Sequence, residues 1–495
     1  MQPKDLYRAV IGEPIPSSAH EEERLKNHEA LAVLSSDALS SVAYATQEIV
    51  LVLGLAGAAA LHLTIPITGL IVGLMVIVGI SYRQTIKAYP HGGGSYTVSH
   101  ENLGSTGGLV AGAALAIDYV LTVAVSVAAG IDAIVSYIPA AGAFRVEMCV
   151  LAVLLLTIAN LRGVRASAGL LSIPTYAFLG AIMILVVGGH IQLLAGTLHS
   201  TPELEQVAQL AHAGRGAASA ITPFLLMRAF SSGCTAMTGI EAISNGVMVF
   251  YPVEWRNARR VLSVMVALLA IMFAGVSSLA VHAGIVYTDT SPTVLYQLGK
   301  NIFGDSFLLL FLQVATLLVL LLAANTAYAD FPRLAALLAQ DGYMPRQLAQ
   351  VGDRLVFDNG IKALGVLSVI LLIVFGGQVN LLIGTYAVGV FACFSLSQAG
   401  MVIHWRKKKG DNWERKALIN GVGSVVTGIV TLVLLVSKFM YGAWLILLVT
   451  PLLIGLFLTI KRHYRFVGTR LRMTAGDLRP LPPLKKGGTP TVVLV

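Results

Sequence analysis

The sequence predicts an all-α polytopic membrane protein with twelve transmembrane helices. Hydrophobic residues make up 56% of the 495 residues and charged residues only 12%, whereas a soluble domain carries about 25% charged residues. Apolar stretches close to the ~20 residues that an α-helix needs to cross a bilayer recur along the chain. Two of these stretches, the first and the sixth, also contain hydroxyl and carboxylate side chains. The pattern therefore predicts a helical bundle whose first and sixth helices are broken.

The predicted spans divide the chain into four parts. In chain order they are 30–57, 65–86, 107–137, 146–161, 170–194, 218–250, 260–283, 306–329, 361–377, 379–404, 417–437 and 440–460. A cytoplasmic segment, 1–29, precedes a core of two five-span halves, about 30–194 and 218–404, and 405–465 holds helices 11 and 12. Residues 466–495 are expected to form a cytoplasmic linker and the first strand of a truncated soluble domain, because they end in the β-branched run "TPTVVLV".

The basic residues predict the orientation of these spans. With the N-terminus in the cytoplasm, nearly all of the 34 lysines and arginines fall on the cytoplasmic side, as the positive-inside rule requires. The exceptions are Arg145, Arg215, Lys300 and Lys438 outside and Arg228 inside span six. The net charge of +9 is therefore a topology signal and does not indicate nucleic-acid binding. Both termini are predicted to be cytoplasmic, an arrangement that suits a transporter and does not exclude a sensor.

The polar stretches of spans one and six read "SSDALSSVAYATQE" (35–48) and "SSGCTAMTGIEAISNG" (231–246). Irregular backbone at membrane depth is tolerated only where it lines a cavity. Interrupted hydrophobic segments at corresponding positions of two halves indicate a transporter binding site. Spans one and six correspond in this way if spans 1–5 and 6–10 form inverted five-helix repeats.

Three further stretches support a resemblance to a known family: "YPHGGGSYTVSHENLG" (89–104), "NGVMVFYPVEWRNARR" (245–260) and "NTAYADFPRLAALLAQDGYMP" (325–345). Together they resemble the amino acid–polyamine–organocation (APC) superfamily, and the span-one motif is similar to that of its KimA-type potassium importers. The resemblance implies broken helices 1 and 6 in inverted repeats, and a proton-coupled potassium importer in the cell (inner) membrane. It also implies a homodimer with a C-terminal domain regulated by cyclic di-AMP. We expect that domain to be mostly absent from this chain.

Oxygen-bearing side chains recur at helical spacing in three spans. Span one carries Asp37, Ser41, Tyr44 and Glu48 along one stripe, span three carries Asp118, Thr122 and Ser126, and span six carries Thr235, Thr238 and Glu241. Potassium needs several oxygen ligands to replace its hydration shell, so these stripes suit a hard monovalent cation. The family resemblance implies these cation-handling positions: Asp37, Tyr44, Asp118, Thr122, Ser126, Thr238, Glu241 and Tyr386.

Purely structural interpretations stay open at this point. Hydroxyls such as those of Thr122 and Ser126 often bond the carbonyl one turn back. The two tyrosines could be packing residues, and Asp37 and Asp118 could form structural ion pairs. Glu48 lies near the outer end of span one, which favours an interfacial or gating role. Asp330 is expected to have a structural role at the end of span eight.

Energy coupling and rival functions complete the expectations. Several carboxylates in one site offer a proton carrier, because like charges disfavour full ionisation; Glu241 is the first choice and Asp118 the second. A polyamine or amino acid transporter of the same fold is the alternative, and a channel or transmembrane sensor is the rival of another class. The sequence shows no arrangement of a nucleophile and a base that would indicate an enzyme. The expected partners are potassium, protons and the lipid bilayer, with no cofactor.

Overall fold

The computed structural model describes residues 24–92, 94–163, 168–198 and 221–471 of the chain. Several parts of the sequence used in the predictions lie outside the described residues: most of the segment 1–29, Gly93 of the stretch 89–104, Arg215 and the predicted soluble strand after residue 471. In the described part the regular secondary structure is helical, with one isolated bridge between Leu25 and Phe250. The prediction of an all-α chain is confirmed for these residues.

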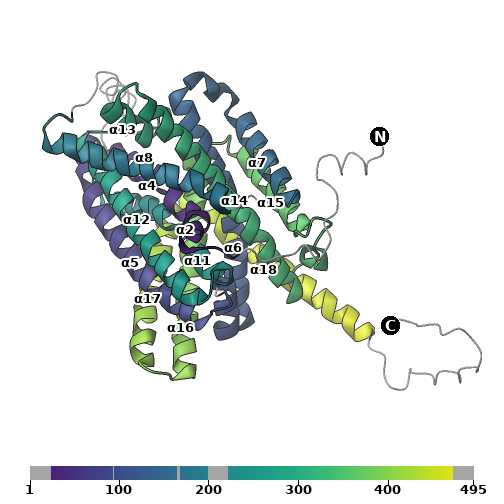
Figure 1. Ribbon diagram of the computed structural model, residues 1–495. Helices are drawn as coiled ribbons and strands as arrows, with labels where there is room; N and C mark the ends of the chain where they lie inside the picture. Colours follow the sequence, from purple (N-terminus) through teal and green to yellow (C-terminus); the bar gives the residue numbers. More distant parts are fainter. Residues whose placement is uncertain (1–23, 93, 164–167, 199–220, 472–495) are drawn as a thin grey trace, which may run out of the picture.

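The helices form one bundle, from which α18 extends at the end of the described chain (Figure 1). In order, the α-helices are α2 (Asn27–Leu34), α3 (Ser36–Ser40), α4 (Val42–Leu53), α5 (Thr64–Ala88), α6 (Ser95–Tyr137), α7 (Arg145–Leu161), α8 (Ala168–Leu194), α10 (Pro223–Gly233), α11 (Ala242–Asn245), α12 (Glu254–His282), α13 (Val294–Phe303), α14 (Phe307–Gln340), α15 (Asp358–Val374), α16 (Val379–Lys408), α17 (Trp413–Lys438) and α18 (Ala443–Arg470). Short 3-10 helices connect several of them: η2 (Gly54–Ala56), η3 (Ala58–Leu63), η4 (Pro139–Phe144), η5 (Cys234–Met237), η6 (Val247–Val249), η7 (Arg346–Ala349) and η8 (Phe439–Tyr441).

Ten helical segments in the described ranges are long and apolar enough to cross a membrane. The protein is therefore a multi-pass membrane protein, as predicted. Two other predicted spans are not among these ten segments. The span at 218–250 is divided into α10, η5, α11 and η6, and the span at 361–377 is α15, of 17 residues. The count of twelve and the inverted-repeat topology stay predictions.

Helix α6 lies at the centre of the bundle. The most apolar part of α6 is 94% buried, whereas that of α18 is 17% buried. Helices α14 and α16 pack against α6, and small residues allow their close approach. A Cβ added at Gly389 of α16 would lie 3.3 Å from the backbone oxygen of Ala114, and one added at Gly130 would lie 3.1 Å from Leu317. This packing buries the predicted oxygen stripe of span three.

Helix α6 consists of two helical parts, and the second part agrees with the third predicted span. The sequence places this span at 107–137, and α6 runs from Ser95 to Tyr137 with a non-helical residue at Gly104. Gly104 adopts φ 82° and ψ −175°, and this conformation divides α6 at a kink. The residues from Ser95 to the kink are thus helical, although they lie outside the predicted spans.

Candidate functional site

Span one breaks at Ser41, between α3 and α4. The hydroxyl of Ser41 lies 2.6 Å from the carbonyl oxygen of Ala38 and 3.0 Å from that of Ala236 in span six. The hydroxyl of Ser40 donates to the carbonyl of Asp37 at 2.9 Å. These serines supply donors to carbonyls near the break, so the polar stretch can lie inside an apolar bundle.

Span six breaks directly after the end of η5. Thr238 is extended, with φ −62° and ψ 149°, and Gly239 follows with φ +76°, a conformation that favours glycine. A Cβ added at Gly239 would lie 2.6 Å from Oδ2 of Asp37 and 2.7 Å from the backbone nitrogen of Ala38. The two helix breaks are therefore in direct contact, and Gly239 makes this contact sterically possible.

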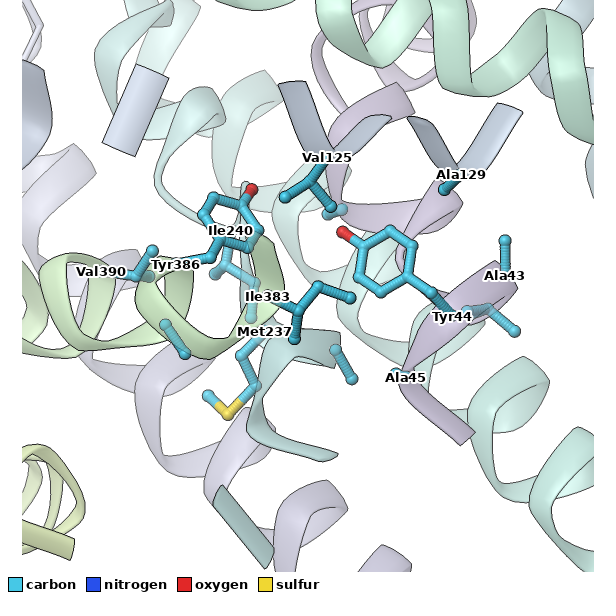
Figure 2. Close-up of a cluster of buried hydrophobic side chains, with 14 of the residues drawn as sticks. Ala43, Tyr44, Ala45, Val125, Ala129, Met237, Ile240, Ile383, Tyr386 and Val390 are labelled. Atoms are coloured by element: carbon cyan, nitrogen blue, oxygen red, sulfur yellow. The ribbon is translucent and has the colours of Figure 1, made fainter. Parts of the chain in front are cut away.

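Hydroxyl groups from three helices, α4, α6 and α16, and from the break of span six gather here. The Tyr44 hydroxyl lies 3.5 Å from Oγ1 of Thr238, and Oγ1 of Thr122 lies 3.0 Å from the Tyr386 hydroxyl. Figure 2 shows the rings of Tyr44 and Tyr386 in one buried cluster with Val125 of α6. Each tyrosine therefore has both roles: its ring packs against apolar neighbours, and its hydroxyl lies beside another hydroxyl.

Two of these hydroxyls also bond their own helix. Thr122 donates to the carbonyl of Asp118 at 2.9 Å, and Thr238 donates to that of Thr235 at 3.1 Å. The predicted bond to the carbonyl one turn back is therefore confirmed for Thr122, and for Ser126 it stays a prediction. A hydroxyl has one proton and two lone pairs, so donating to a carbonyl leaves lone pairs for another ligand. Back-bonding thus orients these oxygens as acceptors.

Asp37 and Asp118 bring two carboxylates to this region. Each residue is 7% exposed, and in each the buried Oδ1 has no hydrogen-bond partner among the described residues. The charges of Glu241 and Asp37 both act on Asp118. Ionised carboxylates removed from water cost several kcal/mol each unless they are paired. The described side chains provide no ion pair for either, so a bound cation or a proton would offset this cost.

Glu241 faces a different set of groups. Its Oε2 accepts hydrogen bonds from Ser95 at 2.9 Å and from Tyr82 at 3.4 Å. Helical spacing predicts that Glu241 and Thr238 share one face, but this prediction is wrong because the chain is not helical at 238 and 239. Glu241 instead lies beside the start of α6, where Ser95 donates to it.

A cavity of about 500 Å³ opens on this side of the bundle. Its lining includes Tyr96, Tyr119, Asn245, Asp330 and Arg333. The amide of Asn245 donates to the hydroxyl of Tyr119 at 3.2 Å. Tyr119 directly follows Asp118 in the sequence. The expected place of Asp330 at a helix end is wrong, because α14 continues through Pro332 to Gln340.

A second cavity of about 450 Å³ lies toward the other end of α6. Its lining includes Asp132, whose carboxylate lies 3.1 Å from the guanidinium of Arg145, and also Asp289. A small void of about 10 Å³ continues from Asp132 to Tyr44 and Gln47, which is room for about one water. Sequence reasoning missed Asp132, although it lies fourteen residues, or nearly four helical turns, after Asp118.

Buried charges also join spans one, six and eleven. Glu48 is 1% exposed and Lys438, which the sequence places outside, is 6% exposed. Lys438 is the strongest charge acting on Glu48, followed by Asp289 and Arg228. The Arg228 guanidinium lies 3.7 Å from the ring centroid of Tyr441. Glu48 is thus buried inside the bundle and does not face the membrane interface, and its gating role stays a prediction.

Comparisons with known proteins cover nearly the whole chain. A family model described as amino acid permease matches residues 28–457. The potassium transporter KimA of Bacillus subtilis (strain 168) is 46% identical over 470 residues, which are 94% of this chain and 76% of that protein. The matched region includes both helix breaks and all eight predicted site residues.

Proposed function

The chain belongs to the amino acid permease family, and from this premise we propose that it is a secondary active transporter that imports potassium ions. The observation that carries the proposal is the pair of buried carboxylates, Asp37 and Asp118, each with an unpartnered oxygen. Hydroxyls of Tyr44, Thr122 and Tyr386 lie in the same region. Charge and many oxygens together suit a cation that exchanges its hydration shell for protein ligands.

The proposed ligand set is the one predicted from the sequence. Asp37 and Asp118 supply charge, and hydroxyls and freed carbonyls at the two breaks supply ligand number. Ser126 lies one turn after Thr122 on α6 and is 1% exposed, so it extends the same oxygen row. Thr238 adds its hydroxyl from the break of span six, next to Tyr44.

Proton symport is the proposed energy source. A membrane potential supplies about 2.3 kcal/mol per charge per 100 mV, so uptake from dilute medium needs a second downhill ion. Potassium offsets one charge, whereas Asp37, Asp118 and Glu241 can carry three negative charges in one region. We assign the coupling proton to Glu241 because hydroxyl partners connect it to the start of α6, and the cavity lining begins nearby. Asp118 is the second candidate.

The topology proposed for this function keeps the sequence predictions. Twelve spans with both termini in the cytoplasm place the cavity at Asn245 inside and that at Asp132 outside. Spans 1–5 and 6–10 are the proposed inverted repeats, and the contact between Gly239 and Asp37 joins their first helices. From the family resemblance we also propose that the protein forms a homodimer in the cell membrane and that cyclic di-AMP regulates it.

Radioactive rubidium uptake into proteoliposomes tests this function. We expect uptake that accelerates when the medium outside is made more acidic than the lumen, and that excess potassium abolishes. A polyamine transporter would instead respond to putrescine, because an organic cation tolerates the same acids. Uptake of putrescine or an amino acid, with no rubidium uptake in any gradient, would overturn the proposal.

A further inference from the structure

Five basic side chains gather where α5 ends and α12 begins. They are Arg83, Lys87, Arg256, Arg259 and Arg260. Three of them surround one indole ring: the charged groups of Lys87, Arg256 and Arg259 lie 5.6, 5.3 and 5.8 Å from the ring centroid of Trp255. The two helices pack against each other, so this basic cluster is a feature of the folded bundle.

The basic cluster has no acidic partner in the described part of the chain. The nearby Glu254 is paired with Arg24 at 2.8 Å. Arg83 donates to the hydroxyl of Ser263, and that hydroxyl in turn bonds the carbonyl of Arg259 at 2.8 Å. The positive charge of Arg83 acts on Arg259, whose buried Nε has no hydrogen-bond partner among the described residues. Two positive charges that act on each other repel, and an anion bound by both guanidiniums would offset this repulsion.

The positive-inside rule explains why basic residues occur on this side of the membrane. It gives no reason for guanidiniums from two different helices to come together with a buried donor left unpaired. The planar guanidinium binds phosphate with two parallel hydrogen bonds, which a pair of arginines can share. The geometry therefore favours a phosphate-bearing ligand over solvated, independent charges.

Aliphatic side chains continue from the basic cluster into the membrane region. On α5, Ile80 and Val76 lie one and two turns before Arg83, and each is 45% exposed. On α12, Val264 lies one turn after Arg260 and is 47% exposed. Trp255 has the amphipathic ring that is typical of the membrane interface. A ligand that contacts both regions has a phosphate at one end and hydrocarbon at the other.

We propose that the surface where the end of α5 packs against the start of α12 binds the phosphate of an anionic phospholipid headgroup. Arg83 and Arg259 hold the phosphate, Lys87, Arg256 and Arg260 surround it, and the acyl chains lie along Val76, Ile80 and Val264. The site is separate from the proposed potassium ligands and does not depend on which ion is transported.

Native mass spectrometry of the detergent-purified full chain tests the proposal, with phosphatidylglycerol and phosphatidylcholine of equal acyl length as probes. We expect wild-type protein to retain phosphatidylglycerol in preference. The double variant Arg83→Gln, Arg259→Gln should bind it at least tenfold more weakly. The matched control removes two exposed cations at the end of α16, Lys407→Gln and Lys408→Gln, and should bind as wild type does.

Two further arms make each outcome decisive. If the double variant does not fold, the exposed pair Arg256→Gln, Arg260→Gln should still weaken phosphatidylglycerol binding severalfold. Inorganic phosphate is added in competition to distinguish a free anion from a headgroup. Failure of inorganic phosphate to displace the lipid supports the headgroup assignment. Equal retention of phosphatidylglycerol by wild type and both basic-cluster variants, or full displacement by inorganic phosphate, would overturn it.

Discussion

The contact between the two helix breaks gives the sharpest structural prediction, which is the effect of Gly239→Ala. Alanine would have to adopt φ +76°, at a cost of about 1–2 kcal/mol. Its Cβ would also lie 2.6 Å from Oδ2 of Asp37 and 2.7 Å from the nitrogen of Ala38, so the carboxylate or span one must move. Interactions of a charged group are worth about 1.5–3 kcal/mol, and 1.4 kcal/mol is tenfold in affinity. We therefore expect potassium to bind about tenfold to a hundredfold more weakly.

Two control variants separate the contact from the backbone strain. Gly284 also has a positive φ, +63°, but a Cβ there would meet nothing within 4 Å. Gly284→Ala should lower the free energy of unfolding by about 1–2 kcal/mol and leave potassium affinity unchanged. Gly73→Ala, in open space on α5, should be neutral or slightly stabilising. The assay is the potassium concentration that half-displaces rubidium from purified protein. Wild-type half-displacement in folded Gly239→Ala would refute the contact between the breaks as part of the site.

Three other predictions follow from the site and its cavities. Tyr386→Phe removes the 3.0 Å bond to Thr122, worth about 1 kcal/mol, and should raise the half-saturating potassium concentration roughly fivefold; unchanged half-saturation would reduce Tyr386 to a packing residue. Glu241→Gln should still bind potassium but lose proton-driven accumulation, as recorded by internal pH during uptake. Continued acidification of the lumen in step with potassium entry would move the coupling proton to Asp118. Asp132→Asn, beside the small void of about 10 Å³, should slow potassium uptake severalfold at low potassium without changing the equilibrium affinity for potassium. An equal loss of uptake rate and of affinity would place Asp132 in the binding site itself.

Helical spacing was sufficient to place those site residues that lie on continuous helices. Asp118 and Thr122 share a buried face of α6, as their spacing predicts, and Thr122 meets Tyr386 there. Spacing failed across the break of span six, because the i, i+3 rule applies only to helical backbone. The glycine at 239 marks this break in the sequence, so Glu241 could have been treated as independent of Thr238.

Contacts between distant segments could not be predicted from one sequence. No local pattern indicates that Gly239 approaches Asp37, or that Ser95 donates to Glu241. The basic cluster is a further example, since Arg83 and Arg259 lie on helices that only the fold brings together. Composition predicted that both arginines face one side of the membrane, but not that they lack an acidic partner among the described residues.

The central claim is that a potassium ion is held by carboxylates where the two broken helices meet. Equilibrium binding of radioactive rubidium to purified protein measures this directly in wild type, Asp37→Asn and Asp118→Asn. Each substitution keeps the side-chain volume and removes one charge beside an unpartnered buried oxygen. The account predicts saturable binding that potassium displaces in wild type, and loss of at least tenfold in affinity in both variants. Wild-type affinity in either folded variant would contradict it.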